Sequence, residues 1–142
     1  DVIVGFPGED EIKYRETYQF LENLDASFYH VFSYSRRPNT PAASMNEQVP
    51  GATITHRSKE LQQLAEQKQD DFYRKNLGST RSVLFESHQK KNKMFGFTDN
   101  YIKIELPYSH ELVEQIKEVN LKEVNENGNV TGVIAIEDRN NL

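Results

Sequence analysis

The chain opens with Asp1-Val2-Ile3-Val4-Gly5-Phe6-Pro7-Gly8-Glu9, a short apolar and β-branched run that passes directly into a Gly-Phe-Pro-Gly turn. Such a run, followed by acidic residues at a helix start, is typical of a parallel strand that delivers a loop to a binding surface. An interior parallel strand needs a neighbour on each side, and the rest of the chain offers at most one. We therefore expect a C-terminal piece of a larger α/β protein, interrupted within its sheet.

The composition is that of an ordinary globular protein. The 142 residues are 36% hydrophobic and 27% charged, with a net charge of −5 and no cysteine. The lack of Cys excludes a disulfide framework, a thiol nucleophile and a Cys-held metal or iron–sulfur site within these residues. The four histidines have no metal-site spacing, so we assign no metal ligand. Without a membrane-length apolar segment or a signal-peptide pattern, we expect a cytoplasmic protein with no membrane partner.

The hydrophobic pattern divides the chain into three zones, at residues 1–52, 53–76 and 77–142. The first zone is predicted to be a β-α-β unit followed by a long loop rich in Pro, Ser, Thr and Asn. Its strand, helix and second strand are expected over residues 2–5, 10–24 and 28–34. The second zone is predicted to be a linker helix, with Thr53 or Thr55 as its N-cap and Gly78 available to end it.

The third zone changes to a period of two, which is typical of strands with one buried face. Alternating apolar residues occur at Val83 and Phe85 and again over 102–106, and a last strand is expected over 130–136 after an Asn-Glu-Asn-Gly turn. Residues 112–124 fit a helix or a strand, and the neighbouring short strands favour a strand. We predict a small antiparallel barrel of the OB-like kind.

Charge is distributed unevenly along the chain. Between His56 and Phe95 there are nine Lys or Arg residues and five Asp or Glu residues, a local net charge of +4. A basic segment can face a phosphate backbone even in an acidic protein, because potentials act within about 8 Å at physiological salt. The alternative for the part before Leu77 is a solvated helix with mixed charges.

Three further motifs stand out along the chain: Val-Ile-Val-Gly-Phe-Pro-Gly-Glu at 2–9, His-Val-Phe-Ser-Tyr-Ser-Arg-Arg-Pro-Asn-Thr-Pro-Ala-Ala at 30–43 and Gly-Phe-Thr-Asp-Asn-Tyr-Ile-Lys at 96–103. In their order and spacing, these motifs resemble the radical SAM methylthiotransferases that modify tRNA. In that family an N-terminal domain and a radical SAM barrel precede a C-terminal TRAM domain. The third motif is most similar to the branch that acts on threonylcarbamoyladenosine in tRNA, rather than the isopentenyladenosine or ribosomal-protein branches.

The resemblance implies a parent transferase that adds a methylthio group to an adenosine next to the anticodon. In the family, one [4Fe-4S] cluster, held by a Cys-x-x-x-Cys-x-x-Cys loop, cleaves S-adenosylmethionine, and a second cluster serves sulfur delivery. This chain contains none of those cysteines, so we expect it to hold neither cluster, to contain no catalytic residue and to be inactive alone. The implied fold is the C-terminal part of a radical SAM α/β barrel, a linker helix and a TRAM-like barrel.

Two loops of the first zone are candidates for binding S-adenosylmethionine in the parent enzyme. Ligands bind at the carboxyl ends of parallel barrel strands, and we expect Gly5, Phe6, Pro7 and Gly8 to form one wall of that pocket. Arg37 is expected to pair with a phosphate or with the methionine carboxylate. The alternatives are a tight strand-to-helix turn without a ligand, and a surface arginine that caps carbonyls of its own loop.

The third zone carries the candidate RNA-binding residues. Proteins hold RNA with a positive surface and with aromatic faces on which bases stack. The residues that provide this mixture are Arg81, Lys90, Lys91, Lys93, Phe95, Phe97 and Tyr101. Alternatively, Phe95 and Phe97 belong to the core, and the lysines only keep an exposed turn soluble.

Two other functions stay open at this point. The isolated chain would be a stand-alone RNA-binding module even if its parent is an enzyme, and a parent of the same architecture could modify a ribosomal protein. A third possibility, a plain structural domain, does not explain three ordered motifs. Exposed sheet edges would favour association of copies or an altered packing of residues 1–50.

Overall fold

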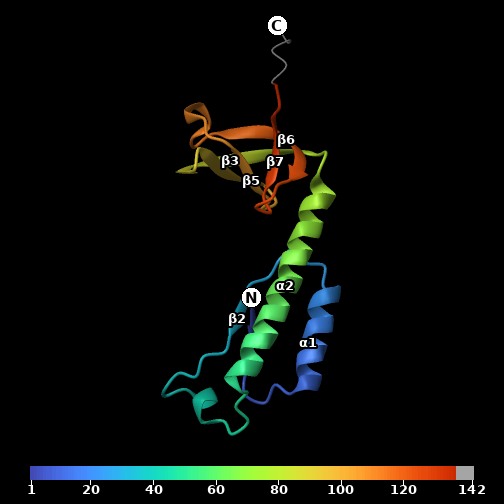
Figure 1. The fold of residues 1–142 in the computed structure, drawn as a ribbon, viewed down its shortest axis with the longest axis vertical. Coiled ribbons are helices and arrows are strands. Elements are labelled where there is room, and N and C mark those ends of the chain that lie inside the picture. Colours follow the sequence, from blue (N-terminus) through green and yellow to red (C-terminus); the bar gives the residue numbers. More distant parts are fainter. Residues whose placement is uncertain (137–142) are drawn as a thin grey trace. The chain divides into compact units, whose positions relative to one another are not determined.

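A computed structural model describes residues 1–136 of the chain. The chain forms two compact units, Asp1–Gln69 and Asp70–Leu142, and Figure 1 shows the order of their elements. The three-zone division expected from the sequence stays a prediction. No helix among the described residues is long and apolar enough to cross a membrane.

The first unit is built on a parallel strand pair. Strand β1 (Val2–Val4) pairs with β2 (Val31–Ser33), and helix α1 (Glu11–Asn23) connects them. The predicted β-α-β unit is therefore confirmed, but β2 is shorter than the expected strand over 28–34 because β1 opposes only three of its residues. The parallel sheet of the described residues has two strands and does not close into an α/β barrel.

Helix α1 begins where its sequence provides a cap. Asp10 has extended backbone geometry, and its carboxylate accepts a hydrogen bond from the Lys13 N–H at 2.8 Å, which satisfies one of the free amides of the first turn. The buried face of α1 contributes Tyr14 and Leu21 to the core of the unit. The other members of this core are Val4, Tyr29, Leu61 and Ala65.

Helix α2 (Gly51–Asn76) is longer than the predicted linker helix and begins earlier. The Pro50 carbonyl already accepts a hydrogen bond from the Ile54 N–H at 3.0 Å, so the first turn is formed before either threonine. Thr55 lies within the helix and donates to the Gly51 carbonyl; the proposed caps at Thr53 and Thr55 are therefore wrong. The loop before α2, expected to be irregular, contains a 3₁₀ turn, η1 (Pro41–Ser44).

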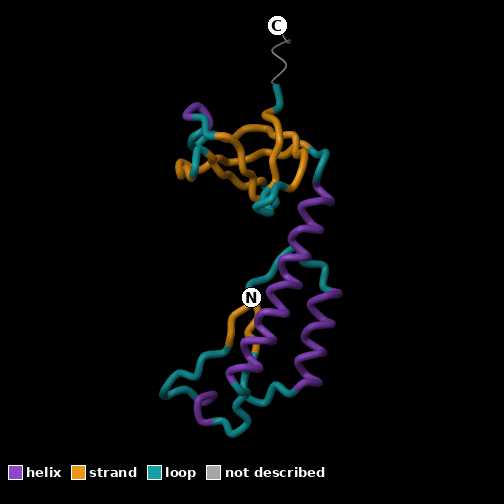
Figure 2. The backbone as a smooth tube through the Cα atoms, viewed as in Figure 1, coloured by secondary structure: helices purple, strands orange, loops and turns teal. Residues whose placement is uncertain are grey.

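The second unit contains a closed barrel of five strands, coloured orange in Figure 2. The strands are β3 (Thr80–Lys90), β4 (Lys93–Thr98), β5 (Lys103–Pro107), β6 (Ile116–Val124) and β7 (Val130–Ile134). They follow the order β3-β4-β5-β7-β6, and antiparallel pairing of β3 with β6 closes the barrel. The small barrel predicted from the sequence is confirmed, including the strand chosen for the ambiguous segment, which a 3₁₀ turn, η2 (His110–Leu112), precedes. The barrel is not wholly antiparallel, because β5 and β7 pair in parallel, and its last strand ends at Ile134 rather than at 136.

Alternation along the strands fills the barrel core. Alternate residues point inward, as in a pleated strand, except at the irregularities between Phe85 and Gln89 and between Leu121 and Glu123. The fully buried members are Val83, Phe85, Met94, Ile102, Ile104, Val119, Leu121 and Val130. Gly78, with φ of +86°, takes a left-handed conformation two residues after α2 ends, as expected for a residue that stops a helix.

Candidate nucleic-acid interface

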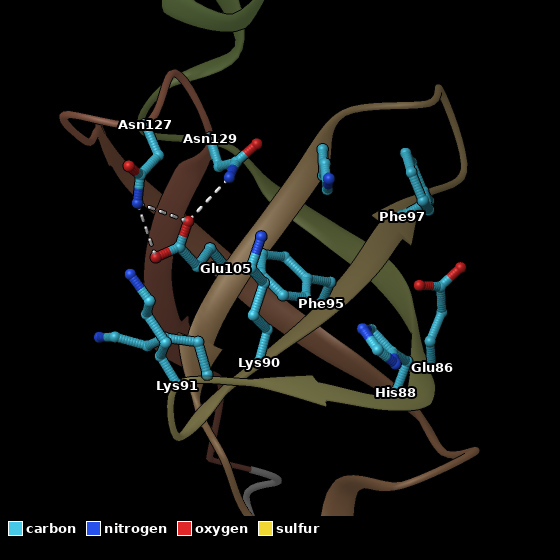
Figure 3. Close-up of a pocket in the computed structure, with 11 residues that line it drawn as sticks. Glu86, His88, Lys90, Lys91, Phe95, Phe97, Glu105, Asn127 and Asn129 are labelled. Carbon is cyan, nitrogen blue, oxygen red and sulfur yellow. Dashed lines mark hydrogen bonds between the residues drawn. The ribbon is translucent and has the colours of Figure 1, made fainter.

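One face of the barrel carries a pocket of about 600 Å³, drawn in Figure 3. Its lining combines basic, aromatic, acidic and amide side chains from β3, β4, β5 and the β6–β7 turn. The residues are Glu86, His88, Lys90, Lys91, Lys93, Phe95, Phe97, Lys103, Glu105, Asn127 and Asn129. Five of the seven predicted RNA-binding residues are thus brought together.

The two phenylalanines line the pocket because of the pleat of β4. Met94, Gly96 and Thr98 point into the barrel and are buried, so Phe95 and Phe97 point outward. Phe95 is half-buried, and the Phe97 side chain is 39% exposed. The alternative in which these two rings form the core is therefore wrong.

The lysines of the pocket rim are carried by the β3–β4 hairpin. Lys91 and Asn92 both have positive φ, 50° and 58°, which is the geometry of a two-residue type I′ turn. Lys90 and Lys93 are directly opposite each other across the ladder, and like charges in that position destabilise a hairpin. The hairpin therefore concentrates positive charge beside the two outward-facing rings.

The third strand adds a cation to the aromatic surface. Lys103 is the cross-strand partner of Phe97, and its ammonium lies 4.9 Å from the centroid of the Phe95 ring. At this distance the cation is attracted by the ring quadrupole. The pocket therefore places positive charge immediately beside a ring face.

A buried carboxylate lies on the same strand. Glu105 is the cross-strand partner of Phe95 and is only 6% exposed. Its carboxylate accepts hydrogen bonds from the Nδ2 atoms of Asn129, at 2.7 Å, and Asn127, at 3.4 Å. Burial raises the pKa of Glu105, but these amides, that of Asn125 and the charge of Lys93 together hold the pKa below its usual value.

Two of the predicted RNA-binding residues lie outside the pocket lining. Arg81 pairs with Asp99, at 3.4 Å, and donates to the Asn76 side chain at 3.3 Å. Tyr101 is 82% exposed in a left-handed conformation in the turn between β4 and β5. Their role in binding RNA stays a prediction.

The four residues of the predicted cofactor loop, Gly5 to Gly8, differ in their surroundings: some are packed in the core and others are accessible. A Cβ atom on Gly5 would lie 2.5 Å from Ile54 Cγ1, so packing alone explains this glycine. Pro7 is buried, whereas Phe6 is 46% exposed and its ring meets the Tyr34 ring edge-on. Gly8 lines a separate cavity of about 370 Å³ together with Lys13 and Arg57.

Arg57, which the sequence did not single out, holds this loop in place. It is 5% exposed, and its Nη1 donates to the Glu9 carbonyl at 2.8 Å and to the Glu9 carboxylate at 3.0 Å. Glu9 in turn accepts from the Gly5 N–H at 3.1 Å. Arg37, by contrast, is exposed in the loop after β2. Among the described residues, no group of three or more His, Cys, Asp or Glu residues could hold a metal ion.

The chain thus combines a β-α-β segment with a small five-stranded barrel that has a lysine-rich aromatic face. No protein-family model matches the chain. Among curated proteins, the threonylcarbamoyladenosine tRNA methylthiotransferase MtaB of Bacillus subtilis is 35% identical over 125 residues. The tRNA-2-methylthio-N(6)-dimethylallyladenosine synthase of Campylobacter jejuni is 37% identical over 121 residues, and the MtaB protein of Aquifex aeolicus is 39% identical over 105 residues.

These matches cover 85%, 85% and 73% of the chain. Over the matched residues the chain belongs to the tRNA methylthiotransferase family, which confirms the resemblance. The chain spans only 28%, 28% and 24% of these relatives' own lengths. The two kinds of enzyme match about equally well, so identity alone does not choose between their substrates.

Proposed function

We propose that this chain is the C-terminal part of a radical SAM tRNA methylthiotransferase and that its barrel, of the TRAM type, binds tRNA. The observation that carries the proposal is the pocket, where four lysines surround two outward-facing phenylalanines. The pocket is lined by the end of β3, by β4 and β5, and by the β3–β4 and β6–β7 turns. OB-like barrels bind oligonucleotides on this face and these loops.

Lysines and aromatic rings contribute differently to such binding. The lysines neutralise phosphates and release counterions, which makes affinity fall as salt rises. Stacking on an aromatic ring contributes about 1–3 kcal/mol per base and tolerates any sequence. The cytoplasmic setting that we expect would supply tRNA as the partner.

The test is charge reversal at the hairpin. In the Lys90→Glu/Lys91→Glu variant we expect weaker binding of tRNA and a salt slope lowered by about 0.7–0.9 per lost phosphate contact, measured by fluorescence anisotropy between 50 and 200 mM salt. The matched control is Lys75→Glu/Lys122→Glu, which makes the same charge change outside the pocket lining. Equal affinity and slope in the two variants would contradict the proposal.

The substrate of the complete enzyme is proposed to be threonylcarbamoyladenosine next to the anticodon, on the strength of the motif at 96–103. Nucleoside mass analysis of tRNA from a strain that lacks the parent gene tests this directly. Loss of the methylthio form of threonylcarbamoyladenosine supports it. Unchanged tRNA with a change in a ribosomal protein would favour the ribosomal-protein branch instead.

We also propose that the parent enzyme uses S-adenosylmethionine and two [4Fe-4S] clusters, which would supply the radical and sulfur chemistry. This chain contains no cysteine, so the clusters would be held elsewhere in the parent, and the chain alone would be inactive. The residues proposed to contact S-adenosylmethionine are Gly5, Phe6, Pro7, Gly8 and Arg37. The exposed ring of Phe6 and the exposed guanidinium of Arg37 support this role, whereas packing against Ile54 accounts for Gly5.

The cofactor assignment is tested in the complete enzyme. We expect Phe6→Ala to weaken S-adenosylmethionine binding measured by isothermal titration, because an apolar face would be lost. Phe20→Ala, which removes an exposed phenylalanine from α1, is the control. An affinity that neither change alters would remove Phe6 from the site.

A further inference from the structure

The pocket contains a feature that phosphate binding and stacking do not require, a buried carboxylate. Four lysines favour an anionic partner, yet Glu105 places a negative charge among them. Its position is defined by the ladder, because it lies directly opposite Phe95 on the neighbouring strand. Cross-strand neighbours have Cβ atoms about 4.5–5.5 Å apart, so a base stacked on Phe95 would bring its edge close to Glu105.

The β6–β7 turn orients its amides toward this carboxylate. The side chain of Asn125 accepts hydrogen bonds from the backbone N–H groups of Asn127 and Asn129, both at 3.0 Å, and so forms the turn. The Nδ2 atoms of Asn127 and Asn129 point at Glu105, and their amide oxygens point away from it, as Figure 3 shows. Both residues also line the pocket.

The carboxylate of Glu105 supplies acceptors at this point of the pocket. An ionised carboxylate has about four lone-pair positions and donates nothing, and Asn127 and Asn129 hold it in place through their Nδ2 atoms. The hydrogen bonds and the nearby lysine keep the pKa of Glu105 low and the group ionised near neutral pH. Adenine N6, cytosine N4 and guanine N2 carry amino groups that donate to such acceptors, whereas uracil has no amino group and its O4 is itself an acceptor.

We propose that Glu105, held by Asn127 and Asn129, forms a subsite that accepts the exocyclic amino group of an adenine, cytosine or guanine base stacked on Phe95 and so disfavours uracil. This inference rests on the proposed RNA-binding function and adds a base preference to it. The lysines bind any sequence, and the subsite selects which base occupies the Phe95 position.

The test compares single-stranded RNA hexamers that differ at one base. The 142-residue chain is titrated into 5′-fluorescein hexamers of sequence UUXUUU, in which X is adenine, unsubstituted purine, cytosine or uracil, and anisotropy is measured at fixed salt. We expect adenine and cytosine to bind about fivefold more tightly than unsubstituted purine and uracil. Adenine and unsubstituted purine stack alike, so their difference isolates the amino group.

The variants then assign the preference to one residue. In Glu105→Gln the preference should fall below twofold, because an amide also offers a donor, while binding of the all-uracil hexamer is not weakened. Glu86→Gln removes the same charge from the same pocket and should keep the fivefold preference. If Glu105→Gln fails to fold by circular dichroism, the comparison of adenine with unsubstituted purine on the unchanged chain decides.

The outcomes separate this inference from the function on which it rests. Equal affinity for adenine and unsubstituted purine, with binding that still falls with salt, overturns the subsite and leaves the RNA interface standing. A preference that Glu105→Gln retains also overturns it. The absence of salt-sensitive binding to every hexamer overturns the proposed RNA interface itself.

Discussion

Glu105 couples the stability of the barrel unit to pH. Its pKa in the folded protein lies below the usual value of 4.5, although burial alone would raise it. A group with a depressed folded pKa stabilises the fold above the unfolded pKa, and this contribution is lost as pH falls through the folded pKa. We therefore expect the free energy of unfolding of the barrel to fall as pH is lowered from about 5 to 3. Urea unfolding followed by circular dichroism measures this change.

The Asn129→Ala variant tests the physical origin of that pH dependence. It removes the 2.7 Å hydrogen bond, the largest of the interactions that lower the pKa. The fall in stability between pH 5 and 3 should be smaller in Asn129→Ala than in the unchanged chain. The ionised form of Glu105 loses a stabilising hydrogen bond, so its folded pKa moves closer to its unfolded pKa. An equal fall in both would show that other carboxylates dominate the acid response.

Arg57 is a buried cation in the first unit, and its ion pairs join α2 to the Gly5–Glu9 loop and to α1. It is almost fully buried and bonds to the backbone and carboxylate of Glu9 and to Glu11. We expect Arg57→Met to lower the free energy of unfolding by about 3–5 kcal/mol, because a buried acid loses its partner. Arg15→Met, which breaks exposed pairs with Glu11 and Glu60, should cost less than about 1 kcal/mol. Similar losses in the two variants, measured by urea unfolding, would refute this ranking.

At the scale of elements, periodicity was enough to predict most strands. Val83 and Phe85, and Ile102 with Ile104, alternate because one face of each strand is the barrel core, and the structure has them fully buried. The start of a helix was harder to predict, because Thr53 by residue type alone is a good N-cap. The Pro50 carbonyl begins the helix earlier, and nothing in residue type marks a carbonyl as the first acceptor.

The pocket could be predicted only where its residues are local in sequence. Lys90, Lys91, Lys93, Phe95 and Phe97 come from one hairpin, so a short sequence window contains them. The acidic and amide residues of the pocket that the sequence did not reveal, Glu105, Asn127 and Asn129, come together through long-range strand pairing. Ile104 pairs with Val130, and this register brings Glu105 next to Asn129. Alternation places Glu105 on the face of β5 opposite Ile104 and Leu106, and no local signal predicts such a pairing.

Gly96 controls how closely β3 and β4 approach. A Cβ atom there would lie 2.6 Å from the Leu84 carbonyl oxygen and 2.8 Å from Val83 Cγ1. The backbone oxygen cannot move without loss of the ladder, so we expect Gly96→Ala to cost about 1–3 kcal/mol or more and to speed amide exchange along both strands. Gly78→Ala, which has open space but a φ of +86°, should cost about 1–2 kcal/mol and leave that exchange unchanged. Amide exchange in Gly96→Ala as slow as in the unchanged chain would refute the role of Gly96 in the close approach of β3 and β4.

At the scale of the whole molecule, the two units have separate tasks in the proposed enzyme. The unit of Asp1–Gln69 presents a strand-to-helix loop of the kind that faces a cofactor, and the unit of Asp70–Leu142 presents the lysine and aromatic pocket. An interaction made equally with bound substrate and with the transition state changes KM and leaves kcat unaltered. Barrel residues that only hold the tRNA should therefore differ in kinetic effect from residues that contact the cofactor.

This distinction leads to a prediction for the complete parent enzyme. The Phe95→Ala/Phe97→Ala variant should raise KM for tRNA by at least about fivefold, because two stacking surfaces are lost, while kcat changes less than twofold. Val133→Ala, at an exposed residue on β7 outside the pocket lining, should change neither constant. Methylthiolation of tRNA followed by nucleoside mass analysis gives both constants. A loss of kcat with unchanged KM would mean that the rings act on the reacting adenosine, and the assignment of the barrel as a tRNA-holding surface would then fail.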